Sequence, residues 1–293
     1  MKKVLSVMLF CLAGVVHAAT PITILVPVAP GGAIDLTART LSRILTENGV
    51  DNVVVNQAGA NGDIAYTHAL KEKDNVILAG AAATFIFSSV IAKRENPYVE
   101  TMTFFAPVVK TATGFVTGPN GYLDFKSMII SARARPLLCG VSNAHGTVEL
   151  TRINKEYDTK FEPVPYKGSG PVATDLGGDH LRCAYDSVGT HVPRHQAGQL
   201  RILSTTQPIP GLTVPLVNSI LPNYTFENWY GFAVPNGGNV LENKKVITIM
   251  TNFSSYTNAT APMVQSGFVL EKTNKNINRV IKSQTKAYQK LLQ

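Results

Sequence analysis

The sequence predicts an α/β protein of two doubly wound lobes, and three observations lead to this prediction. Apolar, β-branched runs alternate with helical patterns, which is typical of parallel βαβ units. The alternation occurs twice, over residues 22–79 and again over residues 137–205. The chain has 293 residues, 45% hydrophobic and 16% charged, which suffices for two apolar cores.

The first set of elements begins with a strand at residues 22–26 and a helix that ends near Gly49. Apolar side chains recur at steps of four, three and four from Ile34 to Leu45, which places one apolar stripe along that helix. Further strands are expected at residues 53–55 and 76–79, with a short helix between them.

The second set begins with a strand at residues 137–142 and a helix that continues to about Tyr157. Three more strands are expected at residues 161–165, 181–185 and 200–205. Apolar strands at residues 104–109 and 229–234 stand where the chain would cross between the lobes, and an amphipathic helix closes the chain. Loops at the carboxyl ends of the strands would then face each other across a cleft.

The N-terminus has the pattern of a secretory signal peptide over residues 1–18. Two lysines precede an apolar centre, and Val16 and Ala18 suit a cleavage site. We therefore expect a periplasmic protein without a membrane span. The net charge of +8 would fall to +6 on cleavage, without a basic cluster, which suits steering of small anions and gives little reason to expect nucleic acid.

The turn after the first strand predicts an anion site. Pro30, Gly31 and Gly32 lead into the helix, so unpaired N–H groups and the positive end of the helix dipole point at the space above the turn. A tight βα connection would need the same small residues. Because the P-loop ending and the third glycine of a dinucleotide fingerprint are missing, a small carboxylate is a better candidate than a nucleotide.

Seven ordered motifs give the chain a family resemblance. The first, V-P-V-A-P-G-G-A-I-D, covers residues 26–35, and N-Q-A-G-A-N-G covers residues 56–62. The others are F-A-P-V at 105–108, V-P-Y-K-G-S-G-P at 164–171, D-S at 186–187, A-G-Q-L-R at 197–201 and W-Y-G-F-A-V-P at 229–235. In this pattern the chain resembles the substrate receptors of tripartite tricarboxylate transporters, the Bug-type solute-binding proteins.

The resemblance implies a type II periplasmic-binding-protein fold with two lobes joined by two crossover strands. Lobe 1 would comprise residues 19–110 and 227–293, and lobe 2 residues 111–226. It also implies capture of a small organic acid without catalysis or cofactor, and delivery to membrane permease subunits, by a chain that we expect to be a monomer. The loop at residues 142–147 departs from the family pattern, with Ala144 in place of a glycine and His145 added.

The expected ligand-binding residues come from both lobes. Backbone N–H groups in the first lobe and short hydroxyl and amide side chains in the second would hold carboxylates. Asp35 could cap the first turn or contact a ligand hydroxyl, His145 could carry charge or lie exposed, and Lys167 is expected to point away from the ligand. The predicted site consists of Pro30, Gly31, Gly32, Ala33, Asp35, Thr84, Ser142, Asn143, Gly146, Thr147, Tyr166 and Asp186.

Two other functions remain open from the sequence. The stretch G-V-S-N-A at residues 140–144 approximates a nucleophile elbow, so Ser142, Asp186 and either His191 or His195 could form the triad of a serine esterase. A periplasmic sensor for a membrane kinase would use the same ligand site. A metal site is not expected, since Pro193 separates His191 from His195 and no C-x-x-C occurs.

The two cysteines that remain after export also leave two alternatives. Cys139 and Cys183 each lie three residues before a predicted site residue, on strands that we expect to be parallel neighbours. Adjacent strands lie about 4.8 Å apart, which suits either a disulfide or two packed thiols.

Overall fold

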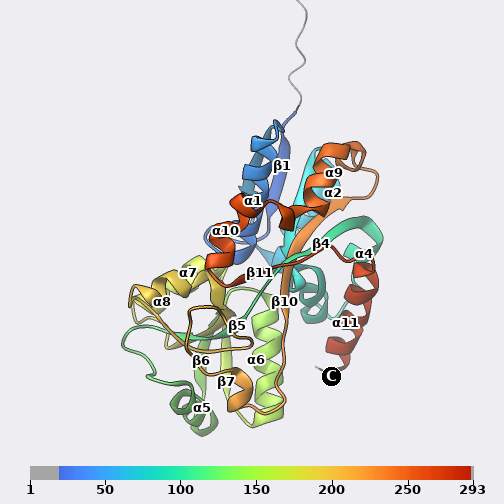
Figure 1. The fold of residues 1–293 in the computed structure, drawn as a ribbon. Helices are drawn as coiled ribbons and strands as arrows, with labels where there is room; N and C mark the ends of the chain where they lie inside the picture. Colours follow the sequence, from blue (N-terminus) through green and yellow to red (C-terminus); the bar gives the residue numbers. More distant parts are fainter. Residues whose placement is uncertain (1–19, 292–293) are drawn as a thin grey trace, which may run out of the picture.

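A computed structural model describes residues 20–291, which form two α/β lobes, one above the other in Figure 1. The first lobe contains a six-stranded sheet of order β11-β4-β10-β3-β1-β2, and the second a five-stranded sheet of order β7-β6-β8-β5-β9. The two-lobe α/β fold predicted from the sequence is confirmed. The predicted signal peptide lies outside the described residues.

The first sheet combines parallel and antiparallel strands. β1 pairs in parallel with β2 and β3, whereas β10 runs antiparallel to β3 and β4, and β11 antiparallel to β4. The strands are β1 (Ile22–Val26), β2 (Asn52–Asn56), β3 (Val76–Ala81), β4 (Met102–Thr111), β10 (Asn228–Pro235) and β11 (Phe268–Leu270).

Helices cover both faces of the first sheet. The helices α1 (Ala33–Glu47), α9 (Lys244–Thr251) and α10 (Thr257–Gln265) share one apolar cluster with it, and α2 (Asp63–Glu72) and α11 (Ile277–Leu291) share another. A π-helix (Ala83–Phe87) follows β3 and continues into the short helix α3 (Ser88–Ile91), and α4 (Tyr98–Thr101) precedes β4.

The second sheet is also mixed, since β5 runs antiparallel to both of its neighbours. Its strands are β5 (Thr113–Thr117), β6 (Leu137–Val141), β7 (Phe161–Pro165), β8 (Cys183–Ser187) and β9 (Arg201–Thr205). The helices of this lobe are α5 (Phe125–Ala134), α6 (Ala144–Tyr157), α7 (Ser169–Gly177) and α8 (Val192–Gln196).

The chain passes between the sheets twice. Only Ala112 separates β4 in the first sheet from β5 in the second, and its carbonyl accepts a hydrogen bond from Val188 N at 2.9 Å. The return from β9 to β10 uses the longer segment of residues 206–227. One apolar cluster contains residues of both lobes, among them Phe87 from the first lobe and Phe115 from the second.

The structure resolves the cysteine alternatives. Cys139 and Cys183 are register partners on the parallel strands β6 and β8, which confirms the predicted strand neighbours. Both side chains are buried free thiols, and the Cys183 thiol donates to Leu138 O at 3.6 Å. Of the two alternatives, the structure therefore contains the packed thiols.

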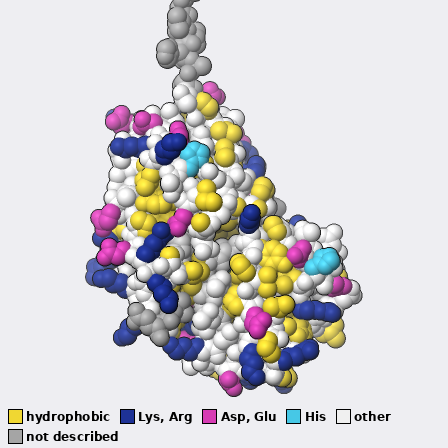
Figure 2. Space-filling view, turned by 180° about the vertical axis from the view of Figure 1, so that it is seen from behind, with side chains coloured by type: hydrophobic (Ala, Val, Ile, Leu, Met, Phe, Trp, Pro, Cys, Tyr) yellow, Lys and Arg dark blue, Asp and Glu magenta, His cyan; other side chains and the backbone are white. Residues whose placement is uncertain are grey.

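The surface shows how the positive charge is distributed. On the face seen in Figure 2, Lys and Arg side chains are spread over both lobes among Asp and Glu. Within residues 20–291, no helix has the length and apolar character that crossing a membrane requires.

Candidate functional site

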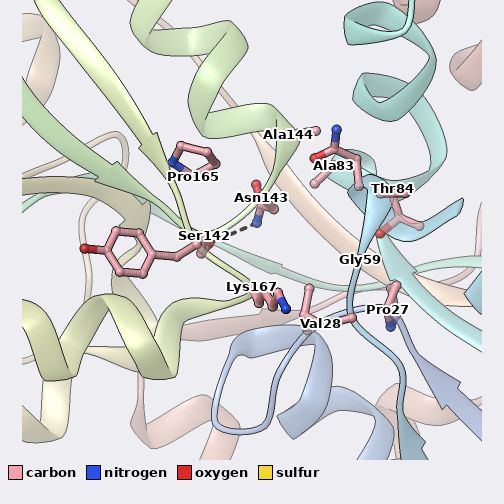
Figure 3. A pocket seen from close by; sticks show the side chains of 14 residues that line it. Pro27, Val28, Gly59, Ala83, Thr84, Ser142, Asn143, Ala144, Pro165 and Lys167 are labelled. Atoms are coloured by element: carbon pink, nitrogen blue, oxygen red, sulfur yellow. Dashed lines mark hydrogen bonds between the residues drawn. The ribbon is translucent and has the colours of Figure 1, made fainter. Parts of the chain in front are cut away.

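A cavity of about 200 Å³ lies between the two lobes, at the carboxyl ends of strands from both sheets. In Figure 3, Pro27 and Thr84 form one wall, and Ser142, Asn143 and Lys167 lie opposite. The full lining consists of Pro27, Val28, Ala58, Gly59, Ala60, Asn61, Ala83, Thr84, Ser142, Asn143, Ala144, Pro165, Tyr166 and Lys167.

The wall from the first lobe contains an unusual backbone segment. The four residues from Gly59 to Gly62 all have positive φ, and Ala60 and Asn61 are among them with φ of 46° and 53°. Left-handed backbone costs non-glycine residues free energy and is frequent at ligand sites. Ala60 and Asn61 also begin a 3-10 turn, so their N–H groups have no acceptor within that turn.

The wall from the second lobe ends at a helix N-terminus. α6 begins at Ala144, directly after Ser142 and Asn143, and no side chain caps its first turn. The free N–H groups and the dipole of this 14-residue helix favour negative charge beside the cavity. The strand-to-helix turn expected from the sequence is present here, and its anion-binding role stays a prediction.

The Ser142 hydroxyl is already engaged within its lobe. It donates to Asp186 Oδ1 at 2.5 Å and accepts from Asn143 Nδ2 at 3.1 Å. Asp186 is fully buried and also accepts from Ser187 N and from His191 Nε2. Burial alone would raise the pKa of Asp186, but hydrogen bonds from His191, Ser142 and Ser169 lower it, so the carboxylate is ionised.

Tyr166 and Lys167 complete the second wall. The Tyr166 hydroxyl donates to Asp175 Oδ2 at 2.7 Å, and burial together with that carboxylate raises the pKa of Tyr166 to about 12. Lys167 is exposed and also lines the cavity, so the expectation that its side chain points away from a ligand stays a prediction.

The Pro-Gly-Gly turn contacts the second lobe and does not line the cavity. Ala29 N donates to Lys167 O at 2.5 Å across the lobes, and Gly32 faces Ser169. Pro30, Gly31, Gly32 and Ala33 are therefore brought to the lobe interface next to the cavity. The anion-binding role expected for these residues stays a prediction, because they lie beside the cavity lining and not in it.

Asp35 holds that turn in shape. Its carboxylate accepts hydrogen bonds from Gly31 N at 3.0 Å, Arg39 Nε at 3.0 Å and Asn56 Nδ2 at 2.9 Å. Because it is buried among these donors and does not line the cavity, the structure favours the capping alternative.

Two residues of the predicted second turn, Gly146 and Thr147, do not line the cavity. A Cβ at Gly146 would lie 2.7 Å from Val141 Cβ, so glycine allows α6 to approach its strand. Thr147 lies one residue further along α6, outside the cavity lining.

His145 is neither exposed nor charged, contrary to both expectations. It is fully buried and stacks on Phe226, with ring centroids 5.1 Å apart. Burial lowers its pKa to about 4 against a smaller opposite effect of Asp186. Neither ring nitrogen has a hydrogen-bond partner among the described residues.

The geometry contradicts the esterase alternative. A catalytic triad places the histidine between the serine and the carboxylate. Here Asp186 lies between Ser142 and His191, and the hydrogen bond given for His195 is to Ile202 N and not to Ser142. Within residues 20–291, no group of three His, Cys, Asp or Glu side chains could hold a metal.

Sequence reasoning missed most of the cavity wall. Of the predicted residues, Thr84, Ser142, Asn143 and Tyr166 line it. The missed residues are mainly apolar or glycine and contribute shape and backbone groups. They are Pro27, Val28, Ala58, Gly59, Ala60, Asn61, Ala83, Ala144, Pro165 and Lys167. The sequence did indicate these residues in one respect: they lie at or directly after the carboxyl ends of strands β1, β2, β3, β6 and β7, where ligands bind in open α/β sheets.

Comparisons with known proteins agree with this geometry. The sequence is 27% identical over 237 residues to Protein BugT of Bordetella pertussis (strain Tohama I), covering 75% of this chain and 72% of that protein. The fold is similar to R. palustris Rpa4515 with adipate, at 22% identity and a TM-score of 0.80, covering 92% of this chain and 95% of that one. It is also similar to MatC from Rhodopseudomonas palustris with bound malate, at 15% identity and a TM-score of 0.79, covering 93% and 99%.

The family description of the tripartite tricarboxylate transporter family receptors matches residues 37–293, which is most of the chain. This match and the similarity to BugT place the protein in the periplasm. The chain belongs to the tripartite tricarboxylate transporter receptor family, and it is a solute-binding protein, not an enzyme.

Proposed function

We propose that this protein captures a small organic carboxylate in the cavity between its lobes and delivers it to the membrane permease subunits of a tripartite transporter. The observation that carries the proposal is the cavity itself, whose walls come from both lobes and which adjoins the uncapped N-terminus of α6. Two proteins of similar fold contain adipate and malate, which supports a mono- or dicarboxylate as ligand.

The site would work by lobe closure. Donors from both walls surround a ligand only when the lobes are in contact, so binding shifts the open and closed populations toward the closed form. The backbone hydrogen bond from Ala29 N to Lys167 O belongs to that closed form. We further propose that residues 1–18 direct export and are then removed, and that the receptor acts as a monomer.

The proposal is tested by calorimetry of the mature protein against acetate, hexanoate, succinate, malate, adipate and citrate. We expect at least one acid to bind and its amide analogue to lose affinity, because a neutral amide does not complement the positive end of a helix dipole. Each hydrogen bond left unmade costs about 1–3 kcal/mol. Equal affinities for acid and amide would contradict carboxylate recognition.

A second experiment distinguishes a transport receptor from a sensor by adding the membrane partner to the ligand-loaded protein. We expect the ligand-loaded receptor to bind permease subunits reconstituted in vesicles more tightly than the ligand-free receptor does. Binding to a sensor kinase in place of the permease would favour the sensor alternative.

A further inference from the structure

We propose that Lys167 is the specificity-determining residue of the cavity and that its ammonium group pairs with a carboxylate of the bound acid. This inference rests on the proposed function, because it concerns how the same cavity selects its ligand.

The hydroxyl groups around the cavity leave few protons for an anion. The Ser142 proton is directed at Asp186, and the Tyr166 proton at Asp175, where each hydroxyl meets a carboxylate within 2.7 Å. A hydroxyl that donates to a carboxylate can still accept from a ligand, but it cannot also donate to one. Of the three hydroxyls that line the cavity, only that of Thr84 has a proton available for donation to a ligand, since its oxygen is engaged as the acceptor of a hydrogen bond from Ala81 N.

Lys167 is the one lining residue with a formal charge among the fourteen. Among the described residues, no carboxylate lies within salt-bridge distance of its ammonium group. The other polar side chains of the lining, those of Asn61, Asn143 and Thr84, are neutral. A carboxylate in the cavity therefore finds one cation, and that cation is available.

The carboxylates nearest the site do not compete for this lysine. Asp35 is held by Gly31, Arg39 and Asn56, and Asp186 is held by Ser142, Ser187 and His191. Asp175 accepts from Tyr166. Because these partners supply hydrogen bonds within the protein, the charge of Lys167 remains for a ligand.

The backbone positions Lys167 only when the lobes meet. Its carbonyl accepts from Ala29 N of the first lobe, so closure fixes the main chain from which the side chain reaches the cavity. Lysine is a compact point charge on a flexible stem, and it suits carboxylates presented at different angles. The pairing then selects for ligands whose carboxylate lies at the end of the cavity nearest Pro165 and Lys167.

The test measures binding of the tightest acid of the panel above to wild type and three variants. Lys167→Met keeps the length of the side chain and removes the charge, whereas Lys167→Arg keeps the charge. Lys126→Met removes a charge from the exposed side of α5 in the same lobe, away from the cavity lining. Each protein is titrated at low and at high ionic strength.

We expect Lys167→Met to bind about tenfold more weakly at low salt, with a smaller salt dependence than wild type, because the lost contact is a charge-assisted hydrogen bond. Lys167→Arg should recover most of the affinity, and Lys126→Met should match wild type. Wild-type affinity and salt dependence in Lys167→Met would overturn the inference while leaving the proposed function intact. Failure of wild type to bind any acid of the panel would overturn both.

Discussion

Three carboxylates beside the cavity, Asp35, Asp175 and Asp186, hold groups of the protein itself. Asp35 fixes the Pro-Gly-Gly turn, and Asp186 fixes Ser142 and His191. Each carboxylate accepts hydrogen bonds from neighbouring groups and thereby fixes the direction in which those groups donate. At the scale of residues, these carboxylates decide which side chains remain for a ligand.

His145 should make the free energy of unfolding depend on pH. Burial lowers its pKa from 6.5 to about 4, so below pH 6.5 the unfolded chain takes up a proton that the folded protein does not. Stability contributed by the neutral ring is thus lost as the pH falls from 6.5 to 4, by roughly 3 kcal/mol at most. His145→Phe should keep the stack on Phe226 and flatten this part of the profile.

The measurement is chemical denaturation of both proteins at several pH values. Glu149 lies one turn further along α6, and burial raises the pKa of its carboxyl above 4.5, so its contribution to stability is lost as the pH rises and has the opposite sign. The difference between wild type and His145→Phe isolates the histidine, since both proteins retain Glu149. Parallel profiles for the two proteins would show that His145 titrates normally.

The two adjacent glycines of the first turn should respond differently to substitution. Gly31 has a φ of +90°, where an alanine costs about 1–2 kcal/mol. Gly32 has a φ of −94°, and its Cβ would lie 3.6 Å from Ser169 N, an ordinary contact. Thermal denaturation should therefore show a loss of stability for Gly31→Ala and little change for Gly32→Ala. Equal losses would refute the assignment of strain to Gly31.

Single residues also show the limit of sequence reasoning. The alternative role of Asp35 as a cap followed from its place in the first helical turn. The burial of His145 did not, because it depends on Phe226, which lies far along the chain and reaches α6 only in the folded protein.

At the scale of elements, strongly periodic segments were predictable and weak ones were not. The helices α1, α6 and α11 and the strands β1, β3, β6 and β8 appear where the patterns placed them. β5 has the sequence T-G-F-V-T, whose glycine weakens the strand pattern, and β11 has only three residues. A Cβ at Gly114 would lie 1.9 Å from Ser204 O, so only glycine allows β9 so close.

The N-terminus of α7 should control closure. A Cβ at Gly170 would lie 2.7 Å from Pro30 O of the opposite lobe, whereas a Cβ at Gly177 of the same helix would meet nothing within 4 Å. Gly170→Ala should weaken ligand binding about five- to tenfold, because the loops must separate, yet leave the lobe folded. Gly177→Ala is the matched control.

Calorimetry and circular dichroism of the two variants give the comparison. A Gly170→Ala protein that binds its acid as tightly as Gly177→Ala would show that the contact with Pro30 does not limit closure. Loss of secondary structure in Gly170→Ala alone would instead assign that glycine to the folding of α7.

At the scale of the whole molecule, the repeated βαβ pattern predicted two lobes, but not how they meet. The approach of residues 29–32 to residues 167–170 joins loops that are distant in sequence, and it requires glycine at Gly170, whose Cβ would lie 2.7 Å from Pro30 O. The motif P-G-G could therefore be recognised in the sequence, but its contact with the loop of residues 167–170 could not.

A cross-link should hold the lobes together. The Cβ of a residue at position 32 would lie 3.8 Å from Ser169 Cβ, the usual separation in disulfides. Gly32→Cys combined with Ser169→Cys should form an intramolecular bridge, found by mass spectrometry, that slows release of bound acid until a reductant is added. The single variants are the controls, and an unbridged double variant under oxidising conditions would contradict the observed contact.

The one-residue connection at Ala112 has a mechanical consequence for the receptor. A single buried residue between two strands offers two backbone dihedrals and no slack, so the lobes can swing about this point but cannot slide past each other. Ala112 then acts as a hinge. A small rotation about it becomes a large displacement at the rim of the lobe interface, where Ala29 meets Lys167. The distance between the two lobes at this rim would thus depend on φ and ψ of one residue.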